Sequence, residues 1–144
     1  METKNLKLIY TLLCDDVRLE MGNKLSMMGI FQSIMVEHLP VSLIKFAVVN
    51  HWRGEGIYQT EVRILSPDKS TVLVASQPSN IELVTGGFTD NVSFFVNVVF
   101  STPGIYWVQT LANSILMEEV ALNITDADTV SGSQKAEEVS ETVN

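Results

Sequence analysis

Cysteine is almost absent from this chain of 144 residues, which has only Cys14. A single cysteine cannot form an internal disulfide, so we expect a reducing, cytoplasmic setting. The chain also lacks an apolar run long enough to span a membrane as a helix. Its first residues lack the basic and apolar regions of a secretory signal, which also favours the cytoplasm.

Positive charge is scarce as well, because 9 Lys and Arg face 17 Asp and Glu and the net charge is −8. Residues 125–144 hold five acidic residues against Lys135, so this segment carries about half of the excess. No basic stripe offsets the acidity, and an acidic surface repels phosphate groups. We therefore expect neither nucleic acid nor an anionic membrane as a partner.

The usual signatures of catalysis and cofactor binding are missing too. The chain has no paired-Cys or paired-His spacing for zinc, no EF-hand loop and no Gly-x-Ser-x-Gly elbow. Gly86-Gly87 is not followed by the Lys-Ser or Lys-Thr of a phosphate-binding loop. We therefore expect no cofactor and no enzymatic activity.

Short alternating segments separated by turn residues dominate what is present. Nine strands are predicted, at residues 6–14, 25–36, 43–52, 57–65, 71–75, 80–84, 91–100, 105–111 and 115–124. The turns include residues 53–56, Ser66 to Lys69 and residues 101–104. The pattern predicts one all-β domain over residues 1–124, an antiparallel, immunoglobulin-like β-sandwich, followed by an acidic, disordered tail over 125–144.

The alternation also predicts which side chains face the core, since residues two apart on a strand share a face. The inward sets are Ile44, Phe46, Val48 and Trp52; Tyr58, Val62 and Ile64; Val92, Phe94, Val96, Val98 and Phe100; and Leu116, Val120, Leu122 and Ile124.

Acidic residues cluster at Asp15, Asp16 and Glu20, and carboxylates so close in sequence can hold a metal. A small metal-dependent enzyme that uses this cluster, with His51 as a further group, is therefore an alternative function. In the structural interpretation, Asp15 and Asp16 end a strand and Arg18 pairs with a carboxylate. Next to these acids Cys14 is expected to be a buried, unreactive thiol.

Aromatic residues suggest a second alternative. Tyr106 and Trp107 are adjacent on a strand, so one of them must face outward, where a ring could stack on a sugar. A carbohydrate-binding sandwich is the function that this pattern would serve.

Apolar residues occupy both faces of the first two predicted strands, which is unusual for antiparallel strands with one face in water. A loop of the chain itself, a second copy or a different protein must cover the extra face. We therefore predict a non-enzymatic module for protein binding or self-association, with Tyr10, Met27, Phe31 and, more weakly, Trp107 on its surface.

Two motifs carry a resemblance to a known family. They are Cys-Asp-Asp-Val-Arg-x-Glu at residues 14–20 and Gly-Asn-Lys-x-Ser-x-x-Gly-Ile-Phe at residues 22–31. Together they resemble the opening of an uncharacterised bacterial family of small β-sandwich proteins, a domain of unknown function. The later Pro67-Asp68 turn and the Pro-Gly-x-Tyr hairpin at 103–106 are similar but less specific. The resemblance implies a compact β-sandwich and no assigned activity, and it transfers no functional residue. From their chemistry, Asp15, Asp16, Arg18 and Glu20 are expected to be structural residues that cap a loop and pair charges.

Overall fold

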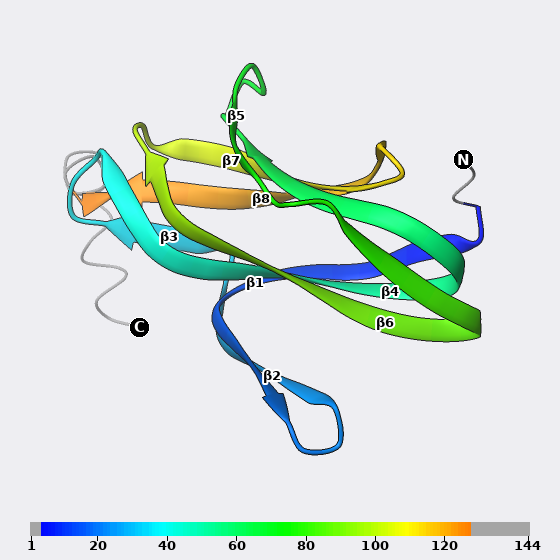
Figure 1. Cartoon of the computed structure of the whole chain (residues 1–144). Coiled ribbons are helices and arrows are strands. Elements are labelled where there is room, and N and C mark those ends of the chain that lie inside the picture. The colour runs from blue at the N-terminus through cyan, green and yellow to red at the C-terminus, as the bar shows by residue number, and fades with distance from the viewer. Residues whose placement is uncertain (1–3, 128–144) are drawn as a thin grey trace, which may run out of the picture.

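The computed structural model describes residues 4–127 and contains eight strands, which form one sheet that curls on itself (Figure 1). The strands are β1 (Leu6–Glu20), β2 (Lys24–Phe31), β3 (Ser33–Val36), β4 (Val41–Leu65), β5 (Val72–Ala75), β6 (Ser79–Phe100), β7 (Gly104–Ala112) and β8 (Ile115–Asp126). The prediction of an all-β chain is confirmed. The described residues include no helix that could cross a membrane.

Two long strands, β4 and β6, organise the sheet. They pair antiparallel with each other from Val41 opposite Phe100 to Thr60 opposite Ser79. On the other edge of β4, β1 pairs with its first half and β7 with its second half. The sheet order is therefore β2-β1-β4-β7-β8-β3, with β5 and β6 on the remaining edge of β4.

A bend in β4 replaces the hairpin loop that the sequence predicted at residues 53–56. Gly54 has a φ of +143° and Gly56 a φ of +114°, and the register with β6 shifts between them. A Cβ on Gly54 would collide with the carbonyl oxygen of Asn5, where the chain enters β1. Glycine at this position lets one continuous strand bend while a neighbouring backbone approaches it closely.

The bend brings the two halves of the sheet face to face around the main core. Both halves contribute, Phe46 and Val48 from the first half of β4 and Val62 and Ile64 from the second. The other buried members are Leu13, Phe95, Val98, Phe100, Tyr106, Val108, Leu122 and Ile124. A second cluster lies near the bend and contains Leu6, Trp52, Tyr58, Ile81, Leu83 and Ala112. Burial of each large side chain contributes about 1.5–3 kcal/mol.

A buried polar contact joins the two halves. The side-chain amide of Asn50 on β4 donates to the hydroxyls of Thr11 on β1 and Thr110 on β7, at 3.0 Å each. Asn50 is fully buried, and β1 and β7 belong to opposite halves of the curled sheet. These bonds fix the relative position of the halves, because loss of either acceptor would leave a buried N–H unpaired, which is costly. The other polar atom of the same side chain, Oδ1, is buried without a hydrogen-bond partner among the described residues.

The outer face of the first half has a small core of its own. Cys14, Ala47 and Val49 are buried there and alternate with the inward residues of their strands. Tyr10, Val17, Leu25, Met27 and Val92 pack against them. The hairpin of β1 and β2, which projects from the body in Figure 1, thus covers part of the second apolar face with Leu25 and Met27.

The predicted alternation fails at one place in β4 and β6. Ile44 and Lys45 are both exposed, as are Val96 and Asn97 on the paired strand. Asn97 has a φ of +52°, so the strand turns over there and the inward side switches. The predictions that Ile44, Val92, Phe94 and Val96 face the main core are therefore wrong, because Val92 packs on the outer face and the other three are exposed. Val98 and Phe100 are buried as predicted.

Other boundaries also differ from the predictions. Eight strands replace nine, because residues 43–52 and 57–65 are one strand and residues 80–84 and 91–100 are another, whereas 25–36 divides into β2 and β3. Residues 15–20 continue β1 instead of forming a connection. Leu116, expected in the core, is exposed because the register of β7 and β8 shifts beside it. The predicted tail lies outside the described residues from 128 onward, and β8 continues to Asp126.

Two glycine substitutions test the bend. Gly54→Ala should lower the free energy of unfolding by at least about 3 kcal/mol, because backbone strain and a backbone collision add. Gly86→Ala is the matched control, since Gly86 has a φ of +70° but nothing within 4 Å of an added Cβ. It should cost only the strain, about 1–2 kcal/mol. Urea unfolding measures both, and equal losses would contradict the proposed role of Gly54.

Candidate protein-binding surface

A hollow of about 640 Å³ lies where β2 ends, β3 follows and β4 begins. Its lining is mainly apolar, with a few polar groups at the edge. The lining residues are Asp15, Gly29, Ile30, Phe31, Ser33, Ile34, Met35, Ser42, Leu43, Ile44, Lys45 and Phe46. Phe31, one of the predicted surface residues, belongs to this lining and also packs edge-on against Phe46 in the core.

Three large apolar side chains of this hollow are exposed: Ile30, Met35 and Ile44, which we call the Ile44 surface. Ile44 leaves 79% of its area in contact with solvent. Ile44 is exposed because the inward-facing side of β4 changes between Ile44 and Lys45, which places both side chains in contact with solvent. Three such residues around one hollow form a contiguous apolar feature of the kind that marks interaction sites.

Charged groups flank the hollow on the outer side. Lys45 forms an ion pair with Asp16 at 3.2 Å and lies over the ring of Phe94, 4.8 Å from its centroid. The backbone amide of Val17 and then Lys45 lower the pKa of Asp16. Asp15 is exposed opposite Gly29, whose φ is +68° and whose added Cβ would collide with the Asp15 carboxylate. Asp16 is thus paired, while Asp15 is an exposed carboxylate at the hollow.

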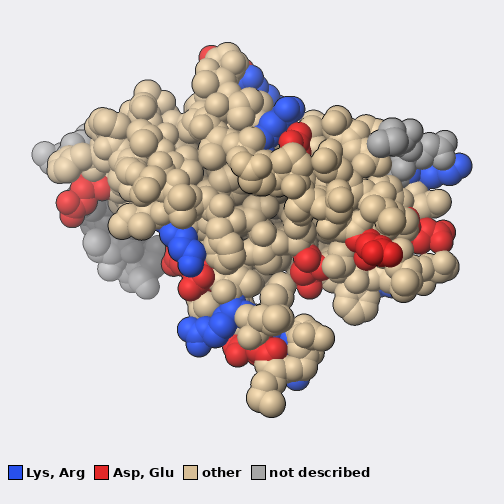
Figure 2. Space-filling view, viewed as in Figure 1, with Lys and Arg blue, Asp and Glu red and all other residues tan. Residues whose placement is uncertain are grey.

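The acidic motif does not gather around one point. Asp16 is directed to Lys45, and Glu20 accepts a hydrogen bond from the hydroxyl of Ser26 at 2.7 Å. Arg18 is exposed and forms no ion pair within residues 4–127, but its charge, after the Val17 amide and Lys45, also lowers the pKa of Asp16, and its pairing with a carboxylate stays a prediction. The same residues contain no group of three His, Cys, Asp or Glu side chains that could hold a metal ion. Figure 2 shows acidic and basic side chains together on the projecting hairpin.

Cys14 is fully buried beneath the hairpin. Burial and then the nearby Asp15 raise the pKa of its thiol. A raised pKa lowers the fraction of thiolate, which is the reactive form of cysteine. The burial of Cys14 is as expected, and its lack of reactivity stays a prediction.

Tyr10 and Met27, also predicted as surface residues, are half-buried against the small outer core. Tyr10 stacks on His51 with 5.0 Å between ring centroids, and His51 lies 2.7 Å from Asp90 through Nδ1. Burial and then the charge of Asp90 raise the pKa of Tyr10. Tyr10 and Met27 therefore cover the small outer core as well as presenting a surface. His51, the further group of the predicted metal site, lies beside Asp90 and not beside the acidic motif.

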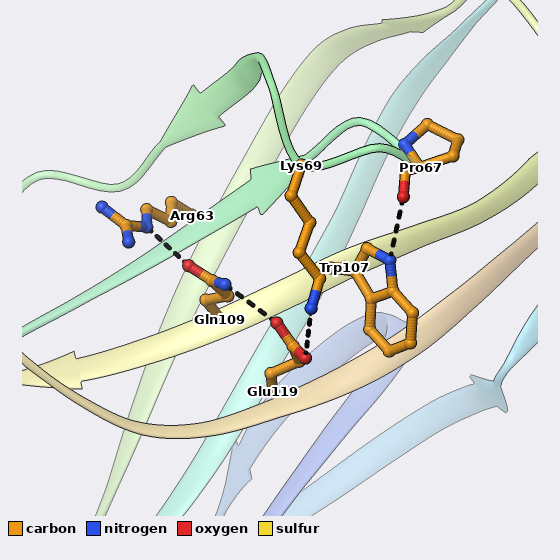
Figure 3. A network of polar contacts seen from close by, with 6 residues as sticks. All are labelled: Arg63, Pro67, Lys69, Trp107, Gln109 and Glu119. Atoms are coloured by element: carbon orange, nitrogen blue, oxygen red, sulfur yellow. Dashed lines mark hydrogen bonds and ion pairs between the residues drawn. The ribbon is translucent and has the colours of Figure 1, made fainter.

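Trp107 is the outward member of the Tyr106-Trp107 pair, but its ring is partly covered (Figure 3). Lys69 lies 4.6 Å from the ring centroid, and the indole Nε1 donates to the carbonyl of Pro67 at 3.3 Å. Tyr106 is buried and donates its hydroxyl to the carbonyl of Thr102 at 2.6 Å. A sugar ring would have to displace Lys69 from Trp107.

A chain of polar contacts holds Lys69 in place (Figure 3). Lys69 pairs with Glu119 at 2.8 Å, and the side-chain amide of Gln109 donates to the same carboxylate at 2.8 Å. The Nε of Arg63 donates to the Gln109 carbonyl, also at 2.8 Å. Lys69 and then Gln109 lower the pKa of Glu119. The network ties the turn after β4 to β7 and β8, so its role is structural.

Comparison with known proteins identifies a family and a likeness in fold. The profile of the Family of unknown function (DUF6941) matches residues 9–125. A comparison with curated proteins finds no match.

Among solved structures, the chain is similar to the Pseudomonas fluorescens alkylpurine DNA glycosylase AlkC bound to DNA with an abasic site analog. The TM-score is 0.54 at 8% identity, and the match covers 84% of this chain but 30% of that protein. β-Glucosidases from Listeria innocua, in complex with glucose, and Erythrobacter marinus match with TM-scores of 0.44 and 0.47 at 8% and 12% identity. These two matches cover 65% and 66% of this chain, but only 15% and 14% of the glucosidases. The AlkC likeness concerns the fold alone.

The turn that carries Lys69 yields a prediction about pH. The hydroxyl and amide of Ser70, and then the hydroxyl of Ser66, lower the pKa of Asp68 to about 2. The ionised carboxylate therefore stabilises the folded turn fully above pH 3.8, and this stabilisation is lost as the pH falls through about 2. A titration of the Asp68 side-chain carbon by NMR should show this midpoint, and Ser70→Ala should raise it. A wild-type midpoint at 3.8 would contradict the role of these hydrogen bonds.

Proposed function

The chain belongs to DUF6941, a family of unknown function, and we propose that it is a non-enzymatic protein-binding module. The observation that carries this proposal is the Ile44 surface, where three large apolar side chains are exposed around one hollow. Scattered single apolar residues are ordinary on a protein surface, whereas a group around a concavity is typical of a binding site.

The chemistry of the hollow fits an apolar anchor of a partner protein. Phe31, Leu43 and Phe46 line it with side chains that the core already holds in place, so an entering side chain meets a rigid wall. Asp15 and Lys45 stand at its edge and supply charges of both signs that a partner can match. An apolar centre with a polar rim is the usual anatomy of a protein interface.

The same proposal includes the finer features of the fold and the setting. We infer an immunoglobulin-like β-sandwich, which the face-to-face packing of the two sheet halves around one core supports. We also infer a cytoplasmic setting, supported by a single, buried cysteine. We expect the partners to be proteins, including a second copy of this chain, and we expect neither nucleic acid nor a membrane as a partner.

Substitution of Ile44 tests the proposed surface. The tagged full chain, with Ile44→Glu beside the wild type, is used to capture proteins from the lysate of the source organism. Ile44→Glu should lose those proteins that the wild type retains, because a charge would be buried in an apolar contact. For a captured protein that is then purified, the variant should raise Kd at least tenfold, about 1.4 kcal/mol.

Ile57→Glu is the matched control. Ile57 lies on the same strand, is 67% exposed and does not line the hollow. The Ile57→Glu variant should bind the same partners as the wild type. Capture of the same proteins by the wild type and both variants would overturn the Ile44 surface as the binding site.

A further inference from the structure

The strand β6 has an edge that is open. One edge pairs with β4 along almost the whole strand, and within residues 4–127 the other edge pairs with no strand. The residues from Phe88 to Val96 form a regular segment between two irregularities, the register shift near Gly86 and the left-handed Asn97. In an antiparallel strand every second residue directs its N–H and C=O to the free edge, so this segment can accept another strand.

The segment lacks the devices that normally protect an open edge. It contains no Pro, Gly, Lys or Arg, and its one acidic residue, Asp90, is bonded to His51. Phe88, Phe94 and Val96 are exposed on it, Val96 by 62%. Natural proteins guard such edges with lysine, proline or very short strands, and unguarded apolar edges pair with other chains. The composition therefore indicates an edge that is covered by a strand.

Space for that strand is present. A groove of about 360 Å³ lies beside the segment, between residues 91–96 and the stretch from Val74 to Ser79. The one side-chain hydrogen bond across it joins the Asn91 amide to the hydroxyl of Ser79 at 3.1 Å. The chain's own β5 thus stands near the edge without covering it.

We propose that the occupant is a second copy of this chain, with the two β6 strands paired antiparallel about a two-fold axis at Val92. Residues that lie opposite each other in such a pair share a face of the sheet, whereas neighbouring residues of one strand do not. A two-fold axis between two residues would set neighbours such as Val92 and Ser93 opposite each other, so the axis must pass through a residue. An axis at Val92 is the one choice that uses the whole segment, since it sets Phe88 opposite Val96 of the other copy. This edge adjoins the Ile44 surface at Val96, which lies opposite Lys45, but uses different residues, and it extends the proposed function.

The register at Val92 also suits the side chains. Each Phe88 meets Val96 of the other copy, an aromatic and β-branched pair of the kind that stabilises antiparallel strands. Val92 meets itself, and Asp90 meets Phe94, so no two like charges lie opposite each other. Asp90 keeps its contact with His51 on the neighbouring strand, which limits the cost of taking its charge out of water. A second copy therefore satisfies the edge although each chain carries a net charge of −8.

Sedimentation velocity of the full chain over a concentration series tests the pairing. We expect a dimer for the wild type and a Kd at least tenfold higher for Val96→Lys, which places a lysine in the pair twice. Val84→Lys is the matched control, because Val84 lies on the same strand, is 78% exposed and falls outside the segment. Circular dichroism confirms that both variants remain folded. A wild type that stays monomeric, or a dimer that Val96→Lys leaves intact, would overturn the proposal, and a monomer would leave a foreign strand as the occupant of the edge.

Single cysteines locate the axis. Cys14 is fully buried, so a cysteine introduced at the edge is the accessible thiol among the described residues. Val92→Cys should form a disulfide-linked dimer under mild oxidation, because directly opposite Cβ atoms lie about 4.5–5.5 Å apart and a small backbone shift brings them within the roughly 3.5–4.5 Å of a disulfide. Ser114→Cys, in the turn between β7 and β8, should not. Linkage at Asn91→Cys or Ser93→Cys instead would overturn the axis at Val92.

A variant at the other end of the segment distinguishes the two surfaces, because Val96 lies opposite Lys45 at the rim of the hollow, whereas Phe88 lies opposite Arg53. Phe88→Lys should weaken the dimer as Val96→Lys does and leave intact the capture of partners through Ile44, and Ile44→Glu should leave the dimer intact. If Phe88→Lys abolished the dimer and the capture of partners together, the proposal of two surfaces would be wrong.

Discussion

The continuous bend of β4 is the constraint on which the rest of the structure depends. A strand of 25 residues cannot bury both of its halves in one core unless it turns over itself, and Gly54 and Gly56 allow this turn. The bend gives β1 and β7 successive places on one edge of β4 and lets β6 follow the other edge. The contact of Asn50 with Thr11 and Thr110 then joins the halves that the bend has brought together.

Local sequence predicted the parts of the fold that depend on local chemistry. The turn at Ser66 to Lys69, the hairpins around β7 and the burial of Trp52 all follow from turn residues and alternation. Residues 53–56 were misassigned because two glycines with charged neighbours have the composition of a loop. Whether such a segment reverses the chain or bends one strand depends on which strands lie beside it, and the alternation of β4 carries no signal for that.

The candidate surface was predictable in part for the same reason. Phe31 could be identified because apolar residues occupy both faces of its strand, and the structure places it in the hollow. Ile44 could not, because its alternation with Phe46 and Val48 assigns it to the core. The one available signal for the exposure of Ile44 was Asn97, a polar residue within an apolar strand that tolerates a positive φ. The place where the inward face of β4 switches, at Ile44 and Lys45, lies beside Asn97. Tyr10 and Met27 carried the correct signal of two-sided burial, but the chain's own hairpin accounts for much of it.

The switch at Ile44 and Asn97 connects the two proposed surfaces. On β4 it exposes Ile44 at the hollow, and on β6 it ends the regular segment at Val96, so that the open edge is short. A short edge limited by a left-handed residue favours a two-fold pair, in which the same segment is used twice and no edge of the segment from Phe88 to Val96 is left over. Pairing of β6 with a different edge, such as β2, would leave a free edge at each end and add copies without limit. The irregularity that removes Ile44 from the core is therefore also the feature that would close the assembly at two chains.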